Sequence, residues 1–402
     1  MANTLVTCTL VAKESLAIIQ NMLGFAAAVN RDFEEEFTSN QSRGYSPGST
    51  INIKKPPRFV YRAGRVSVPQ STVETTIPLV LSQGGCDLGF TNFERTVSVQ
   101  QFEQKMMAAC ATVVNEIDRQ GLDLARLATF NVIGTPGTLP NTQALALSAI
   151  LGVNQRLDEM GAPRKDRGRT LICNPALNGS IVQGFAGMFN GQGKLSAQFG
   201  SGMMVDSLGL QYAMDQNVVT HTNGTQAVAG TNVNGANQIG ASIIVVGLGG
   251  NMTKGTKITL PGVFAVNPQS RQSTGTLAQW TLTADVAAAA TVLPISPSLV
   301  VSGAFQNASA SPTSGSPFVI FGTASGAFAA NVGYHRDAFT LAMVPMESPG
   351  KNVVDVEQMS DQGITVMVTK FSDGINDNQI MRLDVLFGWA APYPELACLF
   401  AV

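Results

Sequence analysis

The feature that most constrains this fold is a long stretch of the sequence, residues 222–325, that is almost free of charge. It contains only four charged side chains, those of Lys254, Lys257, Arg271 and Asp285. Short β-prone runs at 243–246, 257–260, 279–282, 299–301 and 318–321 alternate with Gly, Asn, Pro and Ser. Because turn residues separate short strands at regular intervals, the pattern predicts an all-β insertion of sandwich or barrel type, with Trp280 as its core anchor.

A different periodicity precedes this segment. Between Ser98 and Thr129 apolar residues recur at spacings of mostly three and four, which predicts one long amphipathic helix. The apolar stripe consists of Val99, Phe102, Met106, Cys110, Val113, Ile117 and Leu124, and the opposite face carries Glu103, Lys105, Glu116, Asp118, Arg119, Asp123 and Arg126. Pro136 and Pro140 end the helical pattern.

The segments on either side of the insertion combine helices and strands. We predict a helix at 141–160, a short buried strand at 170–173, a helix beginning near Pro175 and a loop at 184–202. After the insertion, strands are predicted at 339–344, 364–370 and 380–387. The last two are joined by Asp373-Gly374, a hairpin signature.

The N-terminal part contains charge clusters of opposite sign. Residues 1–42 are typical of a helical arm that closes with acids, Asp32, Glu34, Glu35 and Glu36. Residues 44–78 alternate as in a long two-stranded hairpin, with strands through Ile51, Phe59 and Val66. Between Phe37 and Val73 the charged residues are all basic (Arg43, Lys54, Lys55, Arg58, Arg62 and Arg65). The hairpin is either a solvated ribbon, a docking element across an acidic neighbour, or a nucleic-acid contact.

The overall composition limits the class of protein. Hydrophobic residues at 45% suffice for a packed core, while charged residues at 13% are roughly half the usual share. That shortage indicates either surface covered by other subunits or an uncharged polar surface. A net charge of −2 gives no general attraction to nucleic acid. Five scattered cysteines indicate a reducing cytoplasm rather than disulfides or zinc. The apolar stretch 15–29 favours an arm helix over a signal peptide, and no transmembrane helix is expected.

No pattern indicates catalysis, a cofactor or a metal site. The two histidines, His221 and His335, lie in different segments without a partner at metal-ligand spacing. In the GxSxG match at 44–48, Pro47 and a predicted strand follow the serine, where a nucleophile elbow needs a helix. The run 191–194 lacks the first glycine and the hydroxyl of a phosphate loop. We therefore expect a protein that is not an enzyme.

The order of these segments resembles that of the major capsid proteins of tailed phages, which have the Hong Kong 97 fold. More closely, it resembles the branch of short-tailed-phage coat proteins that carry an inserted β-domain. The stretches 209–217, 252–263 and 382–389 carry the similarity, together with the tail 392–397, in which Tyr393 replaces a basic residue of the family.

The resemblance implies an α+β capsid fold with defined boundaries. They are an N-terminal arm (1–43), an extended loop (44–90), the spine helix of a peripheral domain (91–130), an axial domain (131–221 and 326–356), an inserted barrel-like β-domain (222–325), and peripheral strands with the C-terminus (357–402). The loop cations would contact acids of a neighbouring subunit, with Glu34, Glu35, Glu36, Glu103, Glu116, Asp118 and Asp123 as candidates.

The resemblance also implies the partners. Copies of the chain would form the hexamers and pentamers of an icosahedral shell, assembled in the host cytoplasm with a scaffolding protein and a portal protein. The virion capsid would enclose double-stranded DNA through weak, non-specific contacts, without a membrane. Two alternatives stay open: the shell protein of a bacterial nanocompartment with the same fold, and a β-rich surface adhesin.

Overall fold

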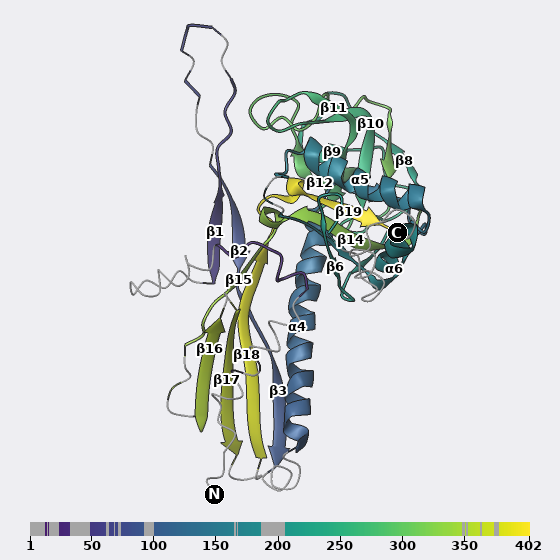
Figure 1. Cartoon of the computed structure of the whole chain (residues 1–402). Coiled ribbons are helices and arrows are strands. Elements are labelled where there is room, and N and C mark those ends of the chain that lie inside the picture. Colours follow the sequence, from purple (N-terminus) through teal and green to yellow (C-terminus); the bar gives the residue numbers. More distant parts are fainter. Residues whose placement is uncertain are drawn as a thin grey trace, which may run out of the picture. The chain divides into compact units, whose positions relative to one another are not determined.

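The structure is a computed structural model with an α+β fold, and its chain forms two compact units (Figure 1). It describes residues 13, 15, 24–32, 49–61, 64–67, 69–70, 74–91, 100–164, 166, 168–185, 206–347, 350, 353–361, 364–373 and 378–402. Unit 1 contains Met1–Ile53, Thr76–Gly121 and Phe339–Ala390, and unit 2 contains Lys54–Thr75, Leu122–Ala338 and Ala391–Val402. No helix in the described part of the chain is long and apolar enough to cross a membrane.

Unit 1 contains an antiparallel sheet built around one long strand. The sheet comprises β3 (Ser82–Thr91), β15 (Thr340–Met343), β16 (Asp355–Asp361), β17 (Ile364–Asp373) and β18 (Asn378–Ala390), in the order β15-β18-β17-β16 with β3 also paired to β18. Asp373 lies opposite Asn378, which confirms the predicted hairpin between β17 and β18. The turn at 374–377 is outside the described residues.

The long helix α4 (Gln100–Ala128) confirms the amphipathic pattern. Cys110, Val113 and Ile117 are buried, and Cys110 lines a small pocket together with Leu88 of β3 and Leu383 of β18. Leu122 is buried as well, whereas Leu124, expected in the stripe, is only half-buried. Small shifts in helix orientation move a neighbouring position into the core.

A glycine inside α4 is explained by a close contact. A Cβ at Gly121 would come within 2.5 Å of the Trp389 ring. The indole Nε1 of Trp389 donates to the Ile117 carbonyl at 3.1 Å. The conformational cost of a glycine within a helix is therefore offset by the packing of a large aromatic side chain.

The predicted hairpin is regular only at its base. β1 (Thr50–Lys55) pairs with β2 (Thr75–Val80), and Ile51, Ile53 and Leu79 are buried in unit 1. The described residues between them form no strand, contrary to the expectation for Phe59 and Val66. Pro56 and Pro57, which follow β1, have no backbone N–H to continue the ladder.

Unit 2 contains a mixed sheet covered by two helices. Its strands are β4 (Val132–Gly134), β5 (Arg169–Cys173), β6 (Gln211–Met214), β14 (Ala327–His335) and β19 (Ala397–Ala401), in the order β4-β19-β14-β5-β6, with β7 (Thr220–Thr222) paired to β14. The helices α5 (Gln143–Glu159) and α6 (Pro175–Phe185) pack Ile150, Val153 and Ile181 into this core. These helices and β5 agree with the predictions. The predicted loop at 184–202 lies almost wholly outside the described residues.

The sheets correct two expected domain boundaries. β19 pairs with β14 and β4, so the C-terminal strand belongs to unit 2 and not with the strands at 357–390. Residues 339–356, expected in the axial domain, belong to unit 1, where Thr340 pairs with Ala390. Both differences arise from pairings between segments far apart in the sequence, which local patterns do not encode.

The charge-poor segment forms a closed β-barrel within unit 2. Its strands are β8 (Ala229–Asn232), β9 (Gly240–Ile244), β10 (Lys257–Val266), β11 (Ser273–Leu282), β12 (Val292–Leu299) and β13 (Pro317–Ile320), in the order β8-β13-β10-β11-β12-β9. A bridge between Val233 and Val245 closes the ring, with Asn234 N donating to Ile244 O at 2.9 Å.

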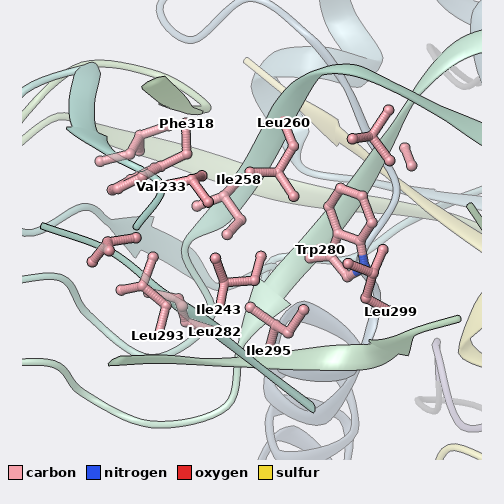
Figure 2. Close-up of a cluster of buried hydrophobic side chains, with 14 of the residues drawn as sticks. Val233, Ile243, Ile258, Leu260, Trp280, Leu282, Leu293, Ile295, Leu299 and Phe318 are labelled. Carbon is pink, nitrogen blue, oxygen red and sulfur yellow. The ribbon is translucent and has the colours of Figure 1, made fainter. Parts of the chain in front are cut away.

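The barrel interior is filled by apolar side chains. Figure 2 shows Ile258, Leu260, Trp280, Leu293 and Phe318 pointing into one cluster. Trp280 is 1% exposed, which agrees with its expected role as an anchor. Two predictions were incomplete: β8 was missed, and the strand expected at 299–301 is β12, which ends at Leu299. β12 contains Pro294 and Pro297, which locally disfavour a strand.

Candidate functional site

The basic loop between β1 and β2 carries the charge feature that the sequence analysis singled out. Lys54 lies 3.4 Å from Glu74, and both side chains are mostly exposed. Such an exposed pair contributes about 0–1 kcal/mol. Farther along the loop, Val60 N donates to Gln70 Oε1 at 2.7 Å and Gln70 Nε2 donates back to Val60 O at 2.7 Å. These hydrogen bonds tie the two limbs of the loop together.

Arg58 is held within its own unit by an acid that the sequence analysis missed. Its guanidinium donates to Glu395 Oε1 at 2.9 Å and lies 5.7 Å from the centre of the Phe305 ring. The side chain of Arg58 is 34% exposed and that of Glu395 is 18% exposed. The available signal was weak: Glu395 is the one acid in the C-terminal stretch 391–402.

Lys55 differs sharply from its neighbour Lys54. Its Nζ lies 5.7 Å from the centre of the Tyr393 ring, and the side chain is only partly accessible. Burial lowers the pKa of Lys55, although the nearby Glu395 charge acts in the opposite direction. Lys55 therefore points toward the barrel and the C-terminal segment of unit 2, whereas Lys54 points to solvent.

The remainder of the described loop exposes large apolar side chains beside positive charge. Phe59 is 54% exposed, Tyr61 is 89% exposed and Val66 is 78% exposed. Arg65 is also exposed. Aromatic and basic side chains presented together are typical of a surface that a partner covers.

The acidic candidates on α4 are not equivalent. Asp118 is 1% exposed, and its two carboxylate oxygens accept hydrogen bonds from Gly24 N and Ala26 N at 2.8 and 2.9 Å. Asp118 thus stabilises unit 1 internally, which corrects its assignment as an acid presented to a neighbour. The helical periodicity predicted Asp118 on the exposed, charged face of α4. The segment 24–32 that covers this carboxylate lies far away in the sequence, so the periodicity of the helix carries no information about it.

Glu116 and Asp123 are accessible but already paired along the helix. Arg119 donates to both oxygens of Glu116, at 2.6 and 2.8 Å, and this interaction lowers the pKa of Glu116. Arg126 donates to Asp123 Oδ1 at 2.6 Å. A neighbouring cation would have to share these carboxylates.

The other candidates cannot be placed. Arg43, Arg62, Glu34, Glu35 and Glu36 lie outside the described residues, and only the backbone of Glu103 is described, within α4.

Both histidines are buried in polar surroundings in unit 2. His221 Nδ1 lies 2.8 Å from Arg126 Nη1, and burial, followed by the Arg126 charge, lowers its pKa to about 4. His335 Nε2 lies 2.8 Å from Asp166 Oδ2, and this hydrogen bond lowers the pKa of Asp166. Among the described residues, no group of three His, Cys, Asp or Glu side chains is placed to hold a metal ion.

Comparison with known proteins identifies similarities at two levels. The sequence matches the model of the family described as "P22 coat protein - gene protein 5" over residues 194–400, just over half of the chain. No curated protein matches the sequence.

Among solved structures, the chain is similar to one from Mycobacterium phage Che8, with 13% identity, a TM-score of 0.49, and 94% of this chain and 90% of that chain covered. It is also similar to the capsid of Ralstonia phage GP4, with 7% identity, a TM-score of 0.47 and coverage of 93% and 87%. A virus-like particle from Pyrococcus furiosus gives 8% identity, a TM-score of 0.42 and coverage of 97% of each chain.

Proposed function

This chain belongs to the P22 coat protein family and is a major capsid protein of a tailed bacteriophage, and from that premise we propose how its copies assemble. Copies form the hexamers and pentamers of an icosahedral shell, with a scaffolding protein directing assembly in the host cytoplasm and a portal protein joining the shell. The finished capsid encloses double-stranded DNA.

The observation that carries this proposal is the exposed surface of the basic loop. Burying apolar area contributes roughly 25 cal/mol per Å², and the exposed rings of Phe59 and Tyr61 offer such area. Arg65 lies close to them in sequence and adds positive charge. A neighbouring subunit that supplies apolar area and carboxylates would match both properties.

The proposed acids that meet the loop are the sequence candidates other than the buried Asp118. Asp118 is removed from the set, and Glu34, Glu35, Glu36, Glu103, Glu116 and Asp123 remain. Exposed ion pairs contribute about 0–1 kcal/mol each, but repetition at every equivalent contact of a shell can set the register between subunits.

The contact with DNA is proposed to be weak and non-specific. A net charge of −2 gives the chain no general attraction to a polyanion. The role is structural rather than enzymatic, as the family membership supports. The same membership favours the phage capsid over the nanocompartment shell and the adhesin.

Electron microscopy of the purified protein tests the proposal. The protein should be expressed alone and together with the scaffolding protein of the same phage. We expect closed shells of uniform diameter in the co-expression, and no substrate turnover. A protein that stays monomeric at high concentration in both preparations would contradict the proposed assembly.

A further inference from the structure

Two adjoining pockets in unit 2 form one groove beside the start of the basic loop. Their volumes are about 410 and 310 Å³, and they share Arg58, Met160, Pro268, Tyr393 and Glu395. Residues of the loop, of the barrel and of the C-terminal segment line them together. We call this feature the basic groove.

The charges along the basic groove do not balance. Three cations line it, Lys55, Arg58 and Arg271, against one carboxylate, that of Glu395. Arg58 takes up that carboxylate in an ion pair of 2.9 Å. Lys55 and Arg271 form no ion pair with any described residue, so the groove retains two positive charges.

A buried donor in the basic groove lacks an acceptor. Arg271 donates through Nη2 to the Phe59 carbonyl, but its Nε is buried without a hydrogen-bond partner in the described part of the chain. A buried unsatisfied donor costs about 1–3 kcal/mol. Lys55 adds a second cationic donor that packs against Tyr393 but makes no hydrogen bond to a described residue. Both positions would gain from a carboxylate.

The residues that line the groove indicate a ligand with apolar groups as well as negative charge. Phe130, Met160, Val266 and Trp280 line the groove and are almost fully buried, and the partly exposed Phe305 ring supplies accessible apolar surface. The matching ligand therefore combines carboxylates with aromatic or aliphatic groups, and inorganic anions do not meet this requirement.

One segment of the sequence has this combination. Residues 33–37 read Phe-Glu-Glu-Glu-Phe, and this is the one place in the chain with three consecutive acids. Each end of the acidic run carries a phenylalanine that could occupy an apolar pocket. The charge of the segment is complementary to the two excess cations of the groove.

We propose that the basic groove of one subunit binds the segment Phe33–Phe37 of a second copy of the chain in the shell. This inference rests on the proposed assembly and names one contact within it. Lys55 and Arg271 pair with glutamates of the segment, and a flanking phenylalanine packs against the apolar wall.

Peptide binding tests the chemistry of the groove. A fluorescent peptide of residues 32–38 is titrated into full-length, unassembled protein that carries Glu34→Gln, Glu35→Gln and Glu36→Gln, so that its own segment does not compete. We expect saturable binding that weakens at least about fivefold in Lys55→Gln and in Arg271→Gln. Arg271→Lys, which keeps the charge, should retain most of the affinity.

Lys54→Gln is the matched control, because Lys54 adjoins Lys55 but does not line the groove. It should leave the affinity unchanged, and a peptide with glutamine at 34–36 should not bind. The absence of saturable binding, or equal losses in Lys54→Gln and Lys55→Gln, would overturn the inference.

Mixed isotope labelling tests whether a second copy supplies the segment. Shells assembled from equal amounts of ¹⁴N and ¹⁵N protein are treated with a carbodiimide, which links carboxylates to nearby amines, and digested for mass spectrometry. Linked peptides that join Lys55 to residues 34–36 should include pairs of mixed isotope. Pairs of a single isotope only would refute binding in trans.

The outcomes separate this inference from the proposed function. Shells that form normally while the peptide does not bind would reject the groove contact and leave the coat function intact. Peptide binding without shells under any condition would reject the proposed assembly instead.

Discussion

Lys257 is a buried side chain that satisfies a backbone carbonyl at the C-terminal end of α4. The side chain is 2% exposed, and Nζ donates to the Arg126 carbonyl in the last turn of α4 and to Thr281 Oγ1, both at 2.8 Å. Burial lowers the pKa of Lys257 well below its ordinary value, and the Arg126 charge acts in the same direction. The amine therefore serves chiefly as a hydrogen-bond donor to a carbonyl that the helix leaves unsatisfied.

We expect Lys257→Met to lower the free energy of unfolding by about 1–3 kcal/mol, because a buried carbonyl and a hydroxyl lose their partner. Urea denaturation of unassembled protein measures the change. Lys254→Met is the control, since Lys254 lies three residues away and is exposed. Equal stability of the two variants would contradict the capping role.

His221 makes stability depend on pH. The folded protein keeps the ring neutral until its pKa of about 4, whereas an unfolded chain protonates it near 6.5. The unfolded state therefore binds more protons between these values, and the free energy of unfolding falls as pH drops from about 6.5 to 4. The loss attributable to this residue reaches about 3 kcal/mol at the acidic end.

His221→Gln should remove that part of the acid sensitivity. Denaturation curves recorded across the range would show a smaller decrease for the variant than for the wild type. Above about pH 7, where the ring is neutral in both states, the two proteins should have the same pH slope. Parallel curves below pH 6.5 would show that the ring titrates normally in the fold.

At the scale of elements, the barrel is a closed unit with several ties to its surroundings. Ring closure leaves no free strand edge, which removes a common route to aggregation. Gln279 of β11 exchanges two hydrogen bonds with Val132, which lies outside the barrel strands. Met160, which follows α5, also packs into the barrel core. The barrel thus has its own core but also depends on unit 2.

We expect residues 222–325 to fold when expressed alone, with lower stability than in the whole chain. A core of side chains from all parts of the barrel supports independent folding, while the loss of the Val132 and Met160 contacts reduces stability. Circular dichroism should show strand signal and a cooperative thermal transition. Trp280→Ala should abolish the transition, whereas Ile239→Ala, at an exposed position, should not. An unfolded spectrum would show that the segment depends on unit 2.

For the whole molecule, the basic loop carries the surface that we propose to contact neighbouring copies. The described loop contributes little to the core of its own chain, since Phe59, Tyr61 and Arg65 are exposed. Changes of its charge should therefore affect contacts between copies more than the stability of each copy.

Arg62→Glu combined with Arg65→Glu should reduce the yield of shells at least about fivefold, because like charges then face the acids of a neighbour. Sedimentation after co-expression with the scaffolding protein measures shell yield, and circular dichroism of the soluble fraction verifies folding. The charge-retaining Arg62→Lys, Arg65→Lys variant should assemble normally. Normal yields from the charge-reversed protein would reject electrostatic docking of the loop.

The sequence by itself determined the elements with strong local periodicity. The stripe of α4, the helix α5, the hairpin of β17 and β18 and the all-β character of 222–325 follow from residue spacing and turn residues. The basic character of the loop could also be predicted from the sequence, because charge is a property of composition. Local signals suffice where the side chains of one segment decide its conformation.

Tertiary structure decided what depends on distant parts of the chain. The partner of Arg58 is Glu395, 337 residues away, and Asp118 is buried by backbone groups more than 90 residues away. The assignment of β19 to the sheet of unit 2 and the closure of the barrel by Val233 and Val245 are likewise long-range pairings. Such contacts form because the whole chain brings separate surfaces together, and no local pattern specifies which surfaces will meet.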